Sequence, residues 1–110
     1  MDPFDLRLWP SFKQAGGTIE VPAIIDQITV DSRRICSPNA LFIALEGDSH
    51  DGHHFISQAC QQGACYVIVK KGWPCQDINK KTTLLRVDHP LKALQEIAKI
   101  YRQQFSCQVI

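Results

Sequence analysis

The sequence predicts a small α/β domain with a mixed β-sheet of about four or five strands and flanking helices. Two continuous apolar runs of strand length, at 41–45 and 65–69, are separated by a segment with helical periodicity. The composition agrees with a globular domain, because 45% of the 110 residues are hydrophobic and 21% are charged. This balance excludes a disordered tail and a strongly charged interaction arm.

The N-terminal part predicts short elements. Residues 5–13 carry apolar side chains at partly helical spacing, interrupted by Pro10, which indicates a short helix or turn. Residues 18–21 alternate weakly and predict an edge strand, and residues 24–30 predict a second extended segment.

The middle of the chain predicts a βαβ unit. The run at 41–45 is typical of a strand buried on both faces. A helix over 53–62 follows, with Asp51 as its N-terminal cap and Gly63 as its C-terminal stop. The strand at 65–69 completes the unit, which is normally parallel and right-handed.

The C-terminal part predicts a strand over 82–87 and then the longest helix, with Pro90 in its first turn. One face of this helix is apolar and consists of Leu91, Leu94, Ile97, Ala98, Tyr101 and Phe105. Residues 107–110 look like the opening of another strand. We therefore expect one domain over 1–106 and the start of a further domain at 107–110.

Charge and targeting signals exclude several classes of protein. Twelve Lys and Arg against eleven Asp and Glu give a formal charge of +1. Such a domain has little long-range electrostatic attraction for nucleic acid or anionic membranes. No apolar run approaches the ~20 residues that span a bilayer, and residues 1–9 lack the apolar stretch of a signal peptide. Five cysteines without a CxxC pair favour reduced, mostly buried thiols. The sequence predicts a cytoplasmic location without membrane insertion.

The histidine-rich segment 50–54 allows three interpretations. A metal site is disfavoured, because His53 and His54 are adjacent and no other ligand pattern accompanies them. Alternatively, Asp51 caps a helix and the histidines are partly exposed. In the third interpretation, residues 47–50 bind an anionic ligand, because they lie between the carboxyl end of a strand and the start of a helix.

A second cluster, residues 30–34 (VDSRR), also follows a predicted strand. Its hydroxyl and guanidinium groups would suit a phosphate or nucleotide. Spacing alone favours an ordinary turn, with Asp31 and Ser32 bonding to nearby backbone and Arg33 paired to an acid. Neither GxxxxGK[ST] nor GxGxxG occurs, and no Cys–His pair indicates a thiol enzyme.

Taken in order, several short pieces resemble the N-terminal domain of the Mur ligases, over roughly residues 28–110. The pieces are 29–33 (TVDSR), 41–47 (LFIALEG), 51–56 (DGHHFI), Ala59 and 63–64 (GA). These ATP-dependent ligases add amino acids to the UDP-linked peptidoglycan precursor. Residues 100–105 (IYRQQF) are most similar to the members that add D-alanyl-D-alanine to UDP-N-acetylmuramoyl-tripeptide. The members that add the third residue are a close alternative.

The resemblance implies a binding role, in which this first domain holds the UDP end of the precursor. Val30 and Ser32 match family positions that contact the nucleotide, and Arg33 belongs to the same motif. Asp48, Ser49 and His50 match the loop that contacts it from the other side. The resemblance implies no catalytic residue and no metal ligand in this chain.

The resemblance also implies that ATP, Mg²⁺ and D-alanyl-D-alanine bind to other domains of a full enzyme. That enzyme would serve cell-wall synthesis, cell shape and division, and this chain alone is expected to be inactive. Two alternatives remain open: a stand-alone nucleotide-binding module and a purely structural domain. Ser32→Ala separates binding from structure, because a binding role predicts weaker nucleotide affinity at near-normal stability.

Overall fold

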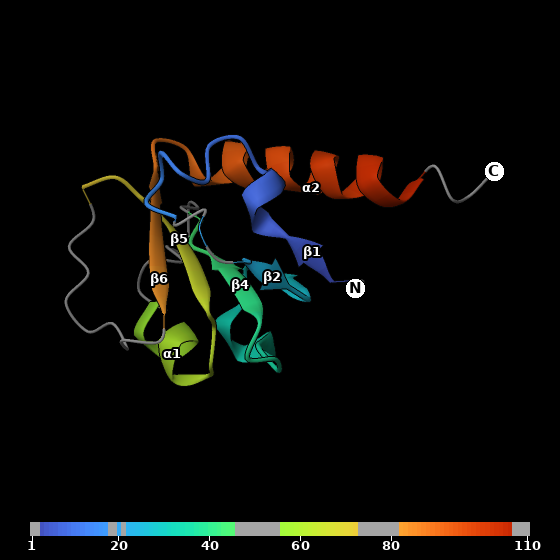
Figure 1. Ribbon diagram of the computed structural model, residues 1–110. Coiled ribbons are helices and arrows are strands. Elements are labelled where there is room, and N and C mark those ends of the chain that lie inside the picture. The colour runs from blue at the N-terminus through green and yellow to red at the C-terminus, as the bar shows by residue number, and fades with distance from the viewer. Residues whose placement is uncertain (1–2, 18–19, 21, 46–55, 73–81, 107–110) are drawn as a thin grey trace.

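The main element of the fold is a four-stranded parallel sheet, seen in a computed structural model that describes residues 3–17, 20, 22–45, 56–72 and 82–106 (Figure 1). Its strands, in their order across the sheet, are β3 (Gln27–Thr29), β4 (Ala40–Ile43), β5 (Tyr66–Lys70) and β6 (Thr83–Val87). All three pairings are parallel, so the four carboxyl ends lie along one edge. The predicted α/β class and the parallel βαβ unit are confirmed.

A second, two-stranded sheet holds the antiparallel pairing. It consists of β1 (Phe4–Asp5) and β2 (Ile24–Ile25). The extended segment expected over 24–30 is therefore divided, because β2 pairs with β1 and β3 joins the parallel sheet. The expected strand over 18–21 lies largely outside the described residues.

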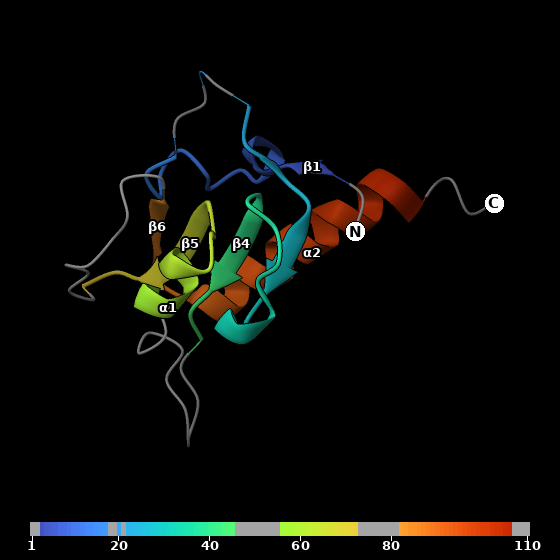
Figure 2. The ribbon, with the colours of Figure 1, turned by 90° about the horizontal axis from the view of Figure 1, so that it is seen from below.

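The other elements are helical. Two 3₁₀ helices, η1 (Leu6–Leu8) and η2 (Ser32–Arg34), follow β1 and β3. Two α-helices, α1 (Ile56–Gln61) and α2 (Pro90–Ser106), follow β4 and β6 in the chain. Figure 2 shows α1 in front of the parallel strands and α2 behind them.

Both faces of the parallel sheet are buried, as its continuous apolar runs predict. Leu41 and Ile43 of β4 face the core shared with α2, and Ala40 and Phe42 face the core shared with α1. Every residue of β4 is buried. This alternation places an apolar side chain against a helix on each face.

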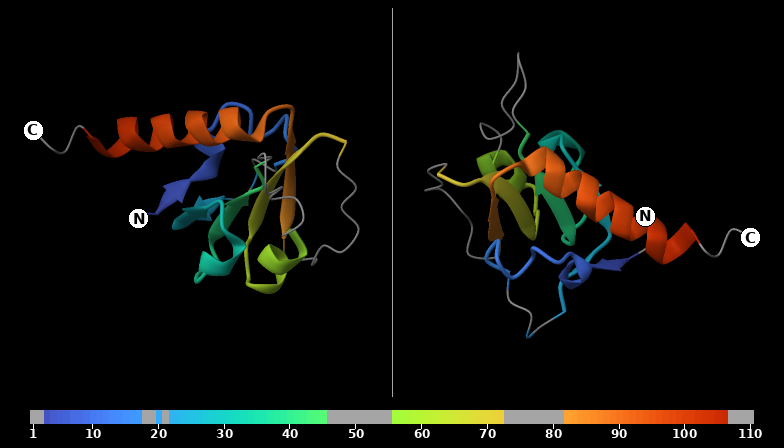
Figure 3. Two further views of the ribbon diagram at one scale, coloured as in Figure 1. Left: turned by 180° about the vertical axis from the view of Figure 1, so that it is seen from behind. Right: turned by 90° about the horizontal axis from the view of Figure 1, so that it is seen from above.

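The N-terminal segment packs on the same face as α2 (Figure 3). Phe4, Leu6, Trp9 and Phe12 are all buried in this core. The indole Nε1 of Trp9 donates to Oε1 of Glu96 at 3.3 Å, and the ring of Phe4 meets that of Tyr101 at a centroid distance of 6.0 Å. The first elements are therefore an integral part of the domain.

Helix α2 begins at Pro90, as expected, but its buried face differs from the predicted one. Ala93 and Ile97 are buried, whereas Leu91 is 55% exposed. Pro90 is also buried, and the next residue lies about 100° further round the helix. The prediction that Leu91 belongs to the apolar face was wrong for this reason. Residues 107–110, the expected strand opening, lie outside the described residues.

Candidate functional site

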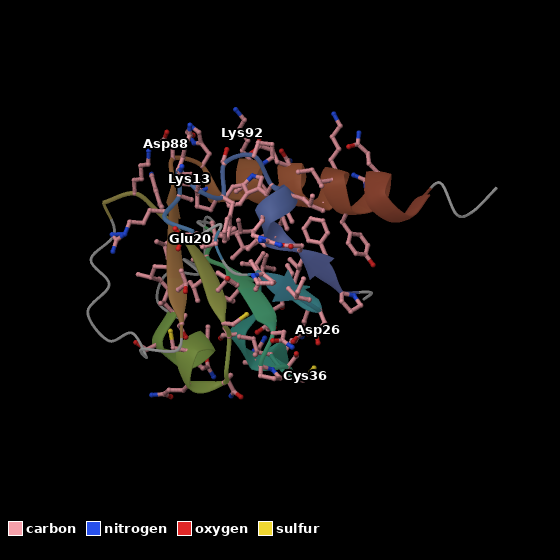
Figure 4. The ribbon with its side chains drawn as sticks, viewed as in Figure 1. Lys13, Glu20, Asp26, Cys36, Asp88 and Lys92 are labelled. Atoms are coloured by element: carbon pink, nitrogen blue, oxygen red, sulfur yellow. The ribbon has the colours of Figure 1, made fainter. Side chains whose placement is uncertain are left out.

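The carboxyl edge of the parallel sheet brings together chain segments that are far apart in the sequence. Val30 follows β3, Leu45 lies shortly after β4, Lys71 follows β5 and Asp88 follows β6. In Figure 4, Asp88 lies near Lys92 at the start of α2, whereas Asp26, directly before β3, lies far from both. Ligands of open α/β sheets bind at the carboxyl edge.

The turn after β3 is held by its own hydrogen bonds. The backbone N of Asp31 donates to Oγ1 of Thr29 at 3.0 Å, and this hydroxyl donates to the carbonyl of Asp31 at 3.1 Å. The Asp31 carboxylate accepts from the backbone N of Arg33 at 3.0 Å and so caps η2. These contacts form the ordinary turn that spacing alone favoured, except that the prediction of a bond from Ser32 to nearby backbone was wrong, because its hydroxyl bonds to the side chain of Gln58.

The same carboxylate pairs with two arginines. Nε and Nη2 of Arg33 each lie 3.1 Å from an oxygen of Asp31, and Nε of Arg34 lies 3.7 Å from Oδ2. Hydrogen bonds from Arg33 lower the pKa of Asp31, and the carboxylate raises the pKa of Arg33. Two guanidinium groups against one carboxylate leave the turn positively charged, and the side chain of Arg33 is 79% exposed. Such a turn suits a phosphate-bearing ligand.

Ser32 and Val30 lie differently in this turn. Ser32 is only 2% exposed, and its Oγ donates to Oε1 of Gln58 on α1 at 2.8 Å. Val30 is 47% exposed at the strand end. Of the predicted contact residues in the turn, Val30 and Arg33 are accessible, and Ser32 lies beneath them.

The other predicted contact residues, Asp48, Ser49 and His50, lie outside the described residues, as do the proposed cap Asp51 and Gly52. The described chain before them ends at Leu45, shortly after β4. Because Thr29 of β3 lies opposite Phe42 of β4, the two predicted contact segments follow neighbouring strands.

Sequence reasoning missed a groove further along the same edge. It has a volume of about 190 Å³ and is lined by Leu45, Lys70, Asp88, His89, Pro90 and Leu91. Beside it, Nζ of Lys71 lies 3.6 Å from Oδ1 of Asp88. The available signal was that polar residues follow both β5 and β6, which end at the edge where β3 ends.

Residues 50–54, which were considered for a metal site, lie outside the described residues. Among the described residues, no group of three or more His, Cys, Asp or Glu is placed to hold a metal ion. Burial raises the pKa of Cys65 to about 11, so this thiol stays protonated at neutral pH. Cys36 is exposed and Cys60 is buried, and both are free thiols. No helix among the described residues is long and apolar enough to cross a membrane.

Comparison with known proteins gives the family. The model of the "Mur ligase family, catalytic domain" matches residues 24–102, which is more than half of the chain. The chain belongs to the Mur ligase family. This confirms the resemblance found in the sequence motifs.

The chain matches relatives of two kinds, ligases that add the third residue and ligases that add D-alanyl-D-alanine. The chain is 38% identical over 85 residues to the UDP-N-acetylmuramoyl-L-alanyl-D-glutamate–2,6-diaminopimelate ligase of Clostridium tetani, covering 77% of this chain and 17% of the relative. It is 35% identical over 98 residues to the UDP-N-acetylmuramoyl-tripeptide–D-alanyl-D-alanine ligase of Bacillus subtilis, covering 86% of this chain and 21% of the relative.

A solved structure shares the fold. The crystal structure of MurF from Acinetobacter baumannii aligns with a TM-score of 0.72 at 23% identity, over 94% of this chain and 22% of that chain. The chain thus spans about a fifth of the length of the proteins it matches.

Proposed function

We propose that residues 1–106 form the domain of a peptidoglycan-precursor ligase that binds the UDP end of UDP-N-acetylmuramoyl-tripeptide. Residues 107–110 would open a central ATP-binding domain. The observation that carries the proposal is the parallel pairing of β3 with β4. Because paired strands lie ~4.8 Å apart, the chain segments that follow them start side by side at the edge where ligands bind.

Within this site, each proposed contact has a chemical reason. Val30 offers an exposed apolar surface for a ring of the nucleotide, and the exposed guanidinium of Arg33 suits the diphosphate. Asp48, Ser49 and His50 would contact the ligand from the segment after β4. Ser32 would support the turn from beneath.

In the whole enzyme, ATP would phosphorylate the tripeptide carboxylate to an acyl phosphate. The amine of D-alanyl-D-alanine would then displace phosphate and form the amide. ATP and Mg²⁺ would bind to other domains, in the cytoplasm, and this chain alone would catalyse neither step. The 110 residues contain no glycine-rich phosphate loop, which agrees with a pure binding role. Holding the distant nucleotide would help to position the reacting carboxylate.

A ligase that adds the third residue is the second candidate, favoured by the 38% identity to the Clostridium tetani relative. It would bind the UDP-linked dipeptide in place of the tripeptide. A stand-alone nucleotide-binding module would bind UDP, and it would bind the UDP-linked dipeptide and the UDP-linked tripeptide equally well. Competition between UDP and the two UDP-linked peptides separates these candidates.

Calorimetric titration with UDP tests the proposed site. Arg33→Ala removes a charged hydrogen-bond donor, so we expect its Kd for UDP to rise roughly tenfold to a hundredfold. Arg102→Ala is the matched control, because Arg102 is also exposed but lies on α2. Equal affinity of the wild type and Arg33→Ala would exclude Arg33 from the site, and no UDP binding by the wild type would contradict the proposed function.

A further inference from the structure

A part-buried hydrogen bond ties the turn after β3 to α1. Ser32 is the buried polar residue of the described part of the chain, and its Oγ donates to Oε1 of Gln58 at 2.8 Å. The two residues are 26 positions apart in the sequence. No buried side-chain N or O atom among the described residues lacks a hydrogen-bond partner. Gln58 supplies this partner for the Ser32 hydroxyl.

The contact is the polar part of a small interface between η2 and α1. Ile35, which ends η2, shares a core cluster with Ile56, Ala59 and Cys60 of α1. Apolar packing holds the turn near the helix but leaves its rotation free to vary, because apolar contacts are not directional. A hydrogen bond is directional, and the bond between Ser32 and Gln58 is partly shielded from water because Ser32 is buried. The Gln58 amide therefore helps to define how η2 is oriented, together with the hydrogen bond of 2.7 Å from Nε2 of Gln27 to the carbonyl of Arg34.

The orientation of η2 determines where the ligand-facing groups point. Val30 lies two residues before Ser32 and Arg33 directly follows it, and both are exposed at the carboxyl edge. We propose that Gln58 is a positioning residue, which acts through the Ser32 hydroxyl to orient Val30 and Arg33 toward the nucleotide. This inference rests on the proposed function and adds to it a residue on another element that touches no ligand.

Two variants of Gln58 test the proposal through UDP affinity. Gln58→Met keeps the length of the side chain but removes the acceptor, which leaves the Ser32 hydroxyl without its partner. Gln58→Glu keeps an acceptor oxygen and should rescue binding. We expect about a tenfold rise in Kd for Gln58→Met and less than about a twofold change for Gln58→Glu. Gln61→Met, at an exposed position of the same helix, is the matched control and should bind as the wild type does.

A double-mutant cycle shows whether Gln58 acts through Ser32. Ser32→Ala should weaken UDP binding about as much as Gln58→Met, and the double variant should bind no more weakly than either single variant. Each Kd is measured at a temperature where circular dichroism shows the variant to be folded, so that loss of stability does not imitate loss of affinity.

The outcomes separate the inference from the proposed function. If Gln58→Met melts at a lower temperature but binds UDP like the wild type, the contact is only structural and the inference is overturned. Additive effects in the double variant would overturn it as well. Failure of the wild type to bind UDP would instead contradict the proposed function, and this result appears before any variant is compared.

Discussion

Asp31 shows how one residue both builds the turn and restrains its arginines. Its carboxylate accepts from the backbone N of Arg33 and also pairs with the Arg33 side chain. An incoming phosphate must therefore compete with Asp31 for the guanidinium. The Arg33 side chain is exposed, and exposed ion pairs contribute little stability, so this exchange costs little. The turn can thus be ordered without a ligand and still release Arg33 to one.

The pKa of Asp31 tests this arrangement. Hydrogen bonds from Arg33 hold the pKa of Asp31 below its ordinary value of 3.8. Any stabilisation from this carboxylate is therefore complete above pH 3.8 and is lost as the pH falls through the lowered, folded-state pKa. We expect Arg33→Gln to raise the pKa of Asp31 toward 3.8, measured by NMR titration of the carboxyl carbon. Arg102→Gln is the control and should leave the pKa of Asp31 unchanged. If Arg33→Gln also leaves it unchanged, Asp31 and Arg33 do not pair in solution.

At the scale of elements, local patterns predicted the central strands and α2, and non-local contacts decided the rest. β4 and β5 were predictable because their apolar runs are continuous, and α2 because its period is helical and Pro90 marks its start. The break between β2 and β3 was not predictable, because it depends on pairing of Ile25 with Phe4, far away in the sequence. The Leu91 error has the same origin, since the sheet and not the helix decides which side chains of the first turn are covered.

The corrected face of α2 predicts contrasting effects of two substitutions in that helix. Ile97 is fully buried, so Ile97→Ala should lower the free energy of unfolding by about 2–5 kcal/mol. Leu91 is exposed, so Leu91→Ala should change it by no more than about 0.5 kcal/mol. Urea unfolding of both variants measures the difference. Similar losses for the two would contradict the orientation of α2 on the sheet.

The candidate site was predictable in part for similar reasons. The motif around Val30, Ser32 and Arg33 is contiguous in the sequence, and its position after a strand could be read from the apolar pattern. The contact between buried Ser32 and Gln58 could not be predicted from the sequence, because it depends on how α1 packs against η2. The groove beside Leu45 was missed because it is assembled from the ends of three strands.

For the molecule as a whole, the two faces of the sheet and its carboxyl edge have separate roles. α2 and the N-terminal segment bury one face, and α1 and η2 bury the other. The parallel strands then present all their carboxyl ends on one edge, where the chain leaves each strand with polar residues nearby. Among the described residues, Val30 and Arg33 at that edge are exposed and belong to neither core, so they can meet a ligand.

The most direct test of this account is a titration of the chain with UDP-N-acetylmuramoyl-tripeptide, followed by amide chemical shifts. We predict that the shifting amides gather at Val30 to Arg33 and at Asp48 to His50, and that ATP at the same concentration does not shift them. Shifts confined to the opposite edge, around Asp26, or no shifts at millimolar ligand would contradict the assignment of the carboxyl edge as the precursor-binding site.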